Sequence, residues 1–558
     1  MIFDSNELTD LVPSPYDICI IGSGPAGLVV ANELRASGLR LAVLESGQLE
    51  KTGHADRLKT VVTTGGIPIK HASRERVLGG ASLTWDGLSA PLEPIDLAER
   101  PWVPLSGWPI RHFELLSFYR QAADRYGFPP PEAYDVHRFS PLKAEGDYSF
   151  SWKNLVERVV LAPVRPQRFG RLLRTIFDSP GLHLFTDATA TDLIVRPSGE
   201  AIHQCLARTR GGKIVTFRST VFVLAAGGIE NARLLLNSKI GNEYDQVGRY
   251  FMNHPKNPSG LVVPARPVSH LPAYFGCLYR GKAAYLALRL ADELQERLGT
   301  LNSYVRFEPL YTWSDTAGVQ LLINYVKSKR WLWENLKSFK GESSALRDYA
   351  ETGDDPDIKL VGEAPSLFGL LLAMLKDSPA VAQYGFYRVF DRLRPRVRAL
   401  RIRNFMEMEP HPDNRVMLSG QKDLYGKPIP VVRHSATSLD KRSLLEIHRV
   451  LGEELKTSGF GDLVSDLTDC EPWPINADAS HHMGSTRMGS DPRTSVVDSN
   501  CLVHGVRNLY VAGSSVFPTS GYANPTYTIV ALAIRLAEHL RAAVQPLIEK
   551  KTRSFDTP

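Results

Sequence analysis

The first 45 residues of the chain constrain its fold most strongly, because they follow the pattern of a β-α-β unit. Residues 16–21 (YDICII) form an almost continuous apolar run that is typical of a buried strand. A tight turn at 22–27 (GSGPAG), a helix at 28–37 and a second strand at 39–45 follow. Such a crossover is right-handed and joins parallel strands, so we expect a parallel sheet with helices on both faces.

Three glycines in this turn are typical of a dinucleotide-binding site. Gly22, Gly24 and Gly27 follow a strand and open a helix, where they allow a tight turn, a close pyrophosphate and close packing of helix on strand. Glu45 ends the second strand, where a carboxylate can accept a hydrogen bond from a ribose hydroxyl. The pattern by itself fits FAD and NAD.

A second glycine cluster favours FAD. Residues 76–85 (RVLGGASLTW) contain Gly79 and Gly80, which let the backbone lie against a flat or anionic ligand. A nicotinamide site usually needs one glycine loop, whereas FAD extends across a domain and needs support at both ends. Taken alone, residues 76–85 also fit an ordinary loop, but the two clusters together indicate a flavin.

The rest of the chain alternates between two kinds of segment. Residues 214–226 contain two strand-like runs and precede a helix, which suggests a return to the first sheet, whereas residues 261–418 have the strands of another sheet. We therefore expect an α/β protein with a discontinuous, Rossmann-like FAD-binding domain and an α+β, sheet-containing substrate-binding domain with helices. The expected segments are the FAD-binding domain at 1–260, with excursions into the substrate domain; the substrate-binding domain at 261–470, with a helical insertion at 327–395; and a return to the FAD-binding domain at 471–558, with the catalytic loop.

Composition argues against several other classes of protein. A length of 558 residues suits two or three domains, and a net charge of +6 is too small over that length to indicate nucleic-acid binding. The five cysteines are too scattered for a zinc ribbon, an iron-sulfur cluster or a disulfide framework. The longest apolar stretch, residues 367–375, is about half the ~20 residues of a transmembrane helix. No secretory signal is visible, so we expect a cytoplasmic protein.

Two segments near the C-terminus carry the candidate catalytic residues. Residues 480–489 (SHHMGSTRMG) present His481 and His482 in a loop of small residues. A surface loop and a metal site are the alternatives, but no third ligand stands nearby, so we expect no metal. Asn524 and Pro525 begin an amphipathic helix as N-cap and first helical residue. The positive end of that helix could stabilise an anionic flavin, or Asn524 could serve only as the cap.

These motifs together resemble those of the glucose-methanol-choline (GMC) oxidoreductases, in the family's order and over essentially the whole chain. They are Gly22–Gly27 with Glu45, residues 76–85, Ala226–Asn231 (AGGIEN), Val247–Pro255 (VGRYFMNHP), His481–Gly489, and Asn508–Ser515 with Asn524 and Pro525. The nearest branch resembles bacterial sugar and polyol dehydrogenases and pyranose oxidases. The resemblance implies FAD-dependent oxidation of an alcohol group on a sugar, glycoside or polyol-like metabolite, with hydride transfer to flavin N5.

The resemblance also implies roles for single residues. His481 would be the base that accepts the hydroxyl proton, with His482 as its neighbour in case of a one-residue misalignment, and Asn524 would orient the alkoxide. Thr84 stands where some relatives tether the flavin through histidine, so we expect non-covalent FAD. The cofactor-binding residues it implies are Gly22, Gly24, Gly27, Glu45, Arg76, Gly79, Gly80, Ser82, Ala226, Gly513, Ser514, Asn524, Pro525 and Thr526.

The partners implied are a small-molecule alcohol and either O2 or a separate electron acceptor. Motifs do not separate an oxidase from a dehydrogenase. Residues 327–340 combine basic and aromatic side chains, so they could dock on an anionic membrane or a protein partner, or form an ordinary helix or lid. Two other functions stay open: a flavin-bearing lyase similar to the hydroxynitrile lyases of this fold, and a non-catalytic flavoprotein subunit.

Overall fold

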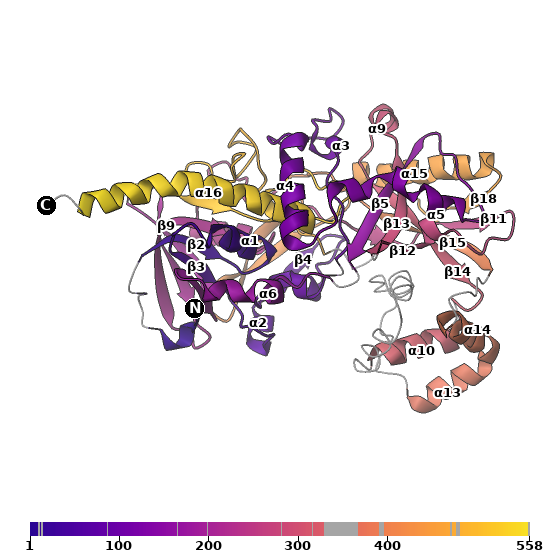
Figure 1. Cartoon of the computed structure of the whole chain (residues 1–558), viewed down its shortest axis with the longest axis horizontal. Coiled ribbons are helices and arrows are strands. Elements are labelled where there is room, and N and C mark those ends of the chain that lie inside the picture. The colour runs from indigo at the N-terminus through magenta and orange to yellow at the C-terminus, as the bar shows by residue number, and fades with distance from the viewer. Residues whose placement is uncertain are drawn as a thin grey trace.

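Two large β-sheets organise the chain (Figure 1). The computed structural model describes residues 1–558 except for several short segments and one longer one. The residues outside the description are 9–11, 13–14, 86, 164–165, 198, 281, 315, 329–365, 390–395, 469–470, 472, 476–479 and 556–558.

The first sheet has a parallel core. Its central strand, β2 (Tyr16–Ile21), pairs in parallel with β3 (Leu41–Leu44) and with β9 (Ile214–Leu224). Apolar side chains on both faces of β2 and β3 are buried, as expected for strands covered on two sides. The strand order is β1 (Ile2–Asp4), β6 (Leu182–Thr186), β3, β2, β9, β8 (Ile202–Arg208) and β7 (Thr189–Val195), with β19 (Leu509–Val511) also parallel to β9.

The prediction that residues 214–226 return to the first sheet is confirmed, and their two strand-like runs belong to a single strand, β9. The first half of β9, residues 214–218, pairs antiparallel with β8, and the second half, residues 219–224, pairs in parallel with β2. Arg218 lies on the exposed side of the strand, so its charge does not interrupt the pairing. The change of partner along one strand produces the two runs that the sequence shows.

The first helix also begins earlier than expected. Helix α1 covers Pro25–Leu34 rather than 28–37, with Gly24 as its N-cap and Pro25 in its first turn. Proline suits this position because the first helical N–H groups have no partner within the helix. Helix α16 (Thr526–Phe555) packs against α1 and α4 (His112–Tyr126), and is the long yellow helix of Figure 1.

The second sheet is antiparallel and lies to the right of the first in Figure 1. It buries a second apolar core, in which Leu286, Val305 and Leu400 are fully buried. Its path is β12 (Cys277–Tyr279), β13 (Lys282–Leu290), β14 (Tyr304–Tyr311), β15 (Val397–Phe405), β11 (Leu261–Pro264) and β18 (Gly461–Val464), with β5 (Leu155–Pro163) beside β13 and β10 (Lys256–Asn257) beside β15. Two sheets of these kinds confirm the predicted fold class. The proposed domain boundaries stay a prediction.

Smaller elements complete the fold. A three-stranded sheet joins β16 (Arg415–Lys422), β17 (Pro428–Arg433) and β4 (Val62–Thr64). The longer remaining helices are α7 (Glu230–Ser238), α15 (Ser438–Thr457), α10 (Ala317–Ser328), α13 (Leu367–Lys376) and α14 (Ser378–Val389). The shorter ones are α2 (Gly53–Arg57), α3 (Pro94–Leu97), α5 (Ser140–Ala144), α6 (Phe169–Leu172), α8 (Pro272–Phe275) and α9 (Asp292–Leu298).

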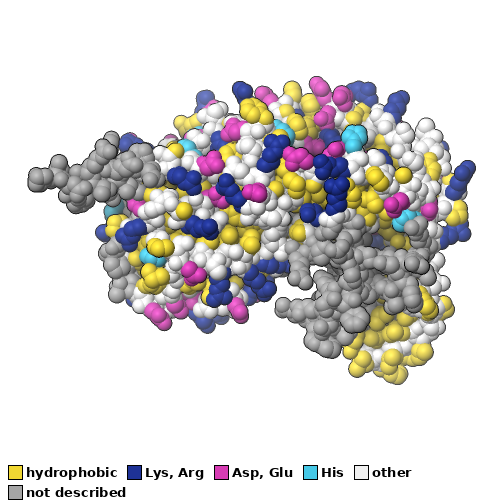
Figure 2. All heavy atoms as spheres, in the orientation of Figure 1, with side chains coloured by type: hydrophobic (Ala, Val, Ile, Leu, Met, Phe, Trp, Pro, Cys, Tyr) yellow, Lys and Arg dark blue, Asp and Glu magenta, His cyan; other side chains and the backbone are white. Residues whose placement is uncertain are grey.

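Helix α13 exposes several large apolar side chains. The side chains of Leu367, Phe368, Leu371 and Leu375 are all more than half exposed, and they contribute to the yellow patch at the lower right of Figure 2. No described helix combines the length and hydropathy needed to cross a bilayer. Most of the basic and aromatic segment 327–340 lies outside the described residues.

Candidate functional site

A cavity of about 480 Å³ lies beyond the carboxyl ends of β2, β3 and β9. Ligands bind at this edge of open α/β sheets, and the volume is typical of a small-molecule site. Most of the residues singled out from the sequence line this cavity, namely Gly22, Gly24, Glu45, Arg76, Gly80, Ser82, Thr84, Ala226, His481, His482, Gly513, Ser514, Asn524, Pro525 and Thr526. Gly27 and Gly79 lie behind the lining, where they serve the packing of the backbone.

Glycine backbone forms one wall of the cavity. A Cβ atom added to Gly24 or to Gly227 would meet no described atom within 4 Å, and one added to Gly513 would approach only the Cβ of Ala26, at 3.9 Å. The N-terminal end of α1 also faces this wall, and the N-cap, Gly24, has no side chain to satisfy the first helical N–H groups. A wall of bare backbone and unpaired N–H groups fits the phosphates of a dinucleotide.

The glycines outside this wall bring chain segments into contact. A Cβ at Gly27 would lie 2.0 Å from the carbonyl oxygen of Gly22, so only glycine lets α1 pack this closely on the turn. The two glycine clusters touch as well. The backbone N–H of Gly79 donates to the carbonyl of Ser23 at 2.9 Å, and a Cβ at Gly80 would lie 3.0 Å from the Cα of Gly24.

Glu45 is held rigidly at the rim of the first sheet. Its buried carboxylate accepts hydrogen bonds from the backbone N–H of Ser23 at 3.3 Å and of Gly47 at 2.8 Å, and also from the hydroxyl of Ser23. The carboxylate therefore faces the glycine turn from the adjacent strand, which is the placement that a ribose requires.

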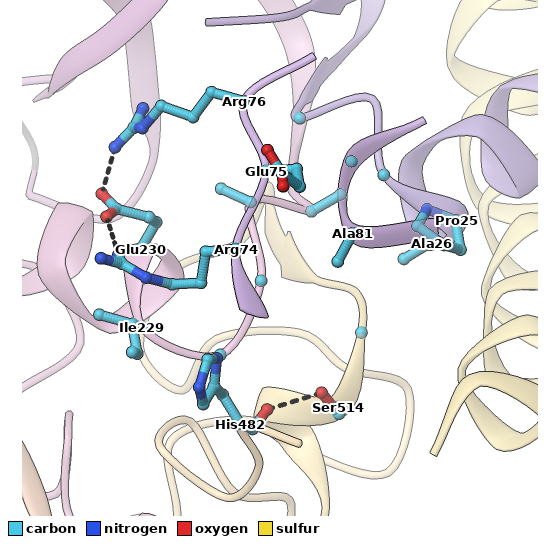
Figure 3. Close-up of a pocket in the computed structure, with 18 of the residues that line it drawn as sticks. Pro25, Ala26, Arg74, Glu75, Arg76, Ala81, Ile229, Glu230, His482 and Ser514 are labelled. Atoms are coloured by element: carbon cyan, nitrogen blue, oxygen red, sulfur yellow. Dashed lines mark hydrogen bonds and ion pairs between the residues drawn. The ribbon is translucent and has the colours of Figure 1, made fainter. Parts of the chain in front are cut away.

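A cluster of arginines around Glu230 forms a second wall (Figure 3). Arg74 and Arg76 reach the two oxygens of this carboxylate at 2.9 and 3.0 Å, and Arg233 approaches it at 3.2 Å. Burial raises the pKa of Glu230, but the three guanidinium groups outweigh burial and lower it to about 2. The carboxylate is therefore ionised, and the cluster retains a net positive charge beside the cavity.

Hydrogen bonds with the segment that follows β19 hold the histidine loop, residues 480–489, in place. The hydroxyl of Ser514 donates to the carbonyl oxygen of His482 at 2.7 Å (Figure 3), and the N–H of Gly484 donates to the carbonyl of Ser514 at 3.2 Å. The ring of His482 stacks on Phe251 with centroids 5.7 Å apart, and burial lowers its pKa to about 3. His482 is thus neutral at ordinary pH and packed against an apolar ring.

His481 lines the cavity and has a polar partner behind it. Its Nδ1 lies 3.0 Å from Nδ1 of His254, and the two rings meet edge to face at 83°. Its backbone N–H donates to the side-chain oxygen of Asn253 at 2.7 Å. Burial and, to a smaller extent, His254 and Lys256 hold the pKa of His481 well below 6.5. His481 is therefore an unprotonated base at neutral pH.

Asn524 does not cap helix α16, contrary to the expectation from its position. The helix begins at Thr526, and the carbonyl of Pro525 accepts the first helical bond, from the N–H of Ile529 at 2.8 Å. The amide of Asn524 instead donates to the carbonyl of Leu88 at 3.1 Å. An amide carries two N–H groups, so this bond leaves one to offer to a ligand.

Sequence reasoning gave no role to several residues of the site. His254 and Glu230 stand only within the motifs 247–255 and 226–231, and Lys256 stands in no motif. A histidine between asparagine and proline, shortly before a strand-like segment, is a signal that could have drawn attention to His254. What the sequence could not show is its contact with a residue 227 positions away.

Comparisons with known proteins identify the family to which the chain belongs. The family model described as "FAD dependent oxidoreductase" matches residues 17–309, and that described as "GMC oxidoreductase" matches residues 410–533. The chain is 26% identical to 6'''-hydroxyparomomycin C oxidase from Streptomyces lividus, over 94% of this chain and 92% of the relative. It is 25% identical to paromamine 6'-oxidase from Streptomyces fradiae, over 96% and 93%. Among solved structures, formate oxidase superimposes with a TM-score of 0.53 at 16% identity, covering 97% of this chain and 100% of that one, which supports the fold.

Proposed function

Because the chain belongs to the GMC family of FAD-dependent oxidoreductases and acts on CH–OH donors, we propose that its substrate is an alcohol group of a sugar or glycoside. The observation that carries this proposal is similarity over nearly the full length to two oxidases that are named for hydroxyparomomycin C and paromamine. None of the relatives described above is named as a lyase.

We assign the chemistry to two residues that line the cavity, His481 and Asn524, and we call the part of the cavity around His481 its catalytic end. Bound FAD supplies the acceptor for the hydrogen that leaves the alcohol carbon as hydride. His481 accepts the hydroxyl proton, and its lowered pKa keeps it free to do so at neutral pH. Asn524 offers an amide N–H to the developing alkoxide.

We assign the binding of FAD to the glycine wall and its surroundings. Gly24, Gly227 and Gly513 would leave room for the pyrophosphate, Glu45 would accept from a ribose hydroxyl, and the arginines around Glu230 would balance negative charge. Thr84 lines the cavity and offers no imidazole for a covalent bond, which supports non-covalent attachment.

An anaerobic absorbance titration tests the function. Purified holoenzyme is mixed without oxygen with matched pairs of neutral and amino sugars, glycosides, polyols and simple alcohols. Bleaching of the flavin spectrum by a saccharide supports the proposal, and readmitting air then separates an oxidase from a dehydrogenase. Bleaching by simple alcohols alone would contradict the substrate class, and a spectrum that no alcohol bleaches would contradict the assigned oxidation.

A further inference from the structure

His254 lies behind the catalytic end of the cavity and contacts two groups of different character. The residue is 2% exposed. Its Nε2 lies 2.8 Å from the carbonyl oxygen of Gly521, and its Nδ1 lies 3.0 Å from Nδ1 of His481. A carbonyl oxygen only accepts hydrogen bonds, so Nε2 of His254 carries a proton.

The protonation state of His254 then determines which of the two rings donates the hydrogen bond between His254 and His481. Burial lowers the pKa of His254 to about 4, and the hydrogen bond to the carbonyl of Gly521 and the charge of Glu407 oppose this shift to smaller extents. At neutral pH the ring therefore has a single proton, and that proton is on Nε2. Its Nδ1 can only accept, so the proton between the two rings belongs to Nδ1 of His481.

We propose that His254 is a positioning residue that holds His481 in the tautomer with its proton on Nδ1 and its lone pair on Nε2. The chain of donors runs from His481 to His254 and from His254 to the carbonyl of Gly521. Because Nδ1 of His481 is turned toward His254, the opposite nitrogen of the ring is the one left to accept a substrate proton from the cavity. The use of this lone pair rests on the function proposed above, in which His481 is the base.

The backbone around the pair supports a fixed geometry. The side-chain oxygen of Asn253 accepts from the N–H of His254 at 3.0 Å and from the N–H of His481 at 2.7 Å, so one amide holds both residues. Gly521 is fixed in turn, because its N–H donates to the buried carboxylate of Glu407 at 3.3 Å. Free imidazole exchanges its tautomers readily, and this arrangement selects one of them.

Two substitutions separate the two contacts of His254. In His254→Asn the side-chain oxygen takes the place of Nδ1 and can still accept from His481, while the bond to Gly521 is lost. In His254→Gln the longer amide can still donate to Gly521, while the acceptor for His481 is lost. Both variants are prepared as holoenzymes, and their FAD content is compared with that of the wild type.

The rate of anaerobic flavin bleaching at saturating substrate distinguishes positioning from mere packing. We expect His254→Asn to keep most of the wild-type rate, and His254→Gln to lose about tenfold or more with little change in KM, because only part of His481 then has the active tautomer. A purely structural role would slow both variants alike. Equal losses in the two variants, or a full rate in His254→Gln, would overturn the proposal.

A direct measurement keeps the proposal testable even if a variant fails to fold. Ring ¹⁵N NMR of histidine-labelled wild-type holoenzyme, with His481 assigned from the spectrum of His481→Asn, reports which nitrogen carries the proton. We expect the proton on Nδ1 of His481, and a proton on Nε2 would overturn the inference. This readout does not depend on turnover, so it distinguishes a wrong tautomer from a wrong catalytic role for His481.

Discussion

Arg100 and Glu407 form a buried two-point ion pair, with both side chains at most 1% exposed. Nη1 of Arg100 donates to Oε2 at 2.9 Å, and Nη2 donates to Oε1 at 2.6 Å. The same carboxylate accepts from the backbone N–H of Asn302 at 2.6 Å and from that of Gly521 at 3.3 Å. The pair thus holds Gly521, whose carbonyl oxygen accepts the hydrogen bond from Nε2 of His254.

Neutralising this carboxylate should destabilise the fold. Glu407→Gln removes the carboxylate that pairs directly with the buried guanidinium of Arg100, which costs ~3 to 5 kcal/mol in the free energy of unfolding. Chemical denaturation followed by circular dichroism measures the loss. The control is Glu99→Gln, an exposed neighbour whose substitution should change little. Equal stability of the two variants would show that the pair contributes nothing net.

A side chain at Gly24 should prevent cofactor binding. The space beyond its Cα is open, so Gly24→Val should fold normally and place two methyl groups where the pyrophosphate is expected. The measurement is the flavin-to-protein absorbance ratio of the purified variant. Gly420→Val is a matched control, because Gly420 is exposed and a Cβ there also meets no described atom within 4 Å. A yellow, active Gly24→Val enzyme would refute the placement of the cofactor.

Removal of the proposed base should slow the chemistry and spare the cofactor. His481→Ala should retain FAD and reduce the rate of anaerobic bleaching by ~10² to 10⁴, the usual contribution of a general base. His482→Gln is the comparison, because the ring of His482 packs on Phe251 and should contribute less to the rate. If His482→Gln instead shows the larger loss, the two histidines exchange roles.

The activity should persist at pH values below the ordinary pKa of histidine. A general base acts in its unprotonated form, and burial holds the pKa of His481 well below 6.5. The value of kcat/KM should therefore stay level as the pH falls through 6.5 and decline only in more acidic solution. A decline centred at 6.5 or above would be inconsistent with a buried base.

The buried histidines should make the fold sensitive to acid. Burial lowers the pKa of His254 to about 4 and those of His434 and His482 to about 3, whereas the unfolded chain has values near 6.5. Below pH 6.5 the unfolded chain therefore binds more protons than the folded one, so the free energy of unfolding falls as the pH decreases from 6.5 toward 3. The stabilisation that comes from keeping these histidines neutral is fully present above pH 6.5.

Denaturation curves at neutral and mildly acidic pH measure this loss. His434 lies outside the cavity lining, with Nε2 3.0 Å from the sulfur of Met408, so His434→Leu removes one titrating group without touching the proposed catalytic residues. The variant should lose less stability than the wild type over the same change in pH. If the free energy of unfolding of the variant depends on pH as that of the wild type does, His434 does not contribute to the loss of stability in acid.

Local patterns were enough to predict strands β2 and β3 and the glycine turn between them. Strand β2 reads as an apolar run, the glycines follow it directly, and Glu45 ends the next strand, so each feature depends only on near neighbours in the sequence. The observed ends of helices and strands differ from the expected ones where tertiary contacts decide the pairing. β9 continues through Arg218 because two different strands pair with its two halves.

The arrangement of the catalytic end could not be read from local patterns. Asn524 was expected to cap a helix, but it donates to Leu88, which lies 436 residues away in the sequence. The contact between His254 and His481 has the same character. Such pairs depend on how the two sheets pack together in three dimensions, which local sequence patterns do not show.

The wide sequence separation of the cavity lining has a consequence for the biosynthesis of the protein. Residues 21–26 form one side of the cavity, while residues 512–514 and 524–529 close it. Strand β19, which precedes the closing segment, takes its place beside β9 only after nearly the whole described chain has been synthesised. Until then the strands around β9 present an unpaired edge, and the nascent chain lacks part of the surface that would hold the cofactor. The complete cavity therefore exists only after residue 529 has been translated, and a cofactor that needs both sides of the cavity binds after that point.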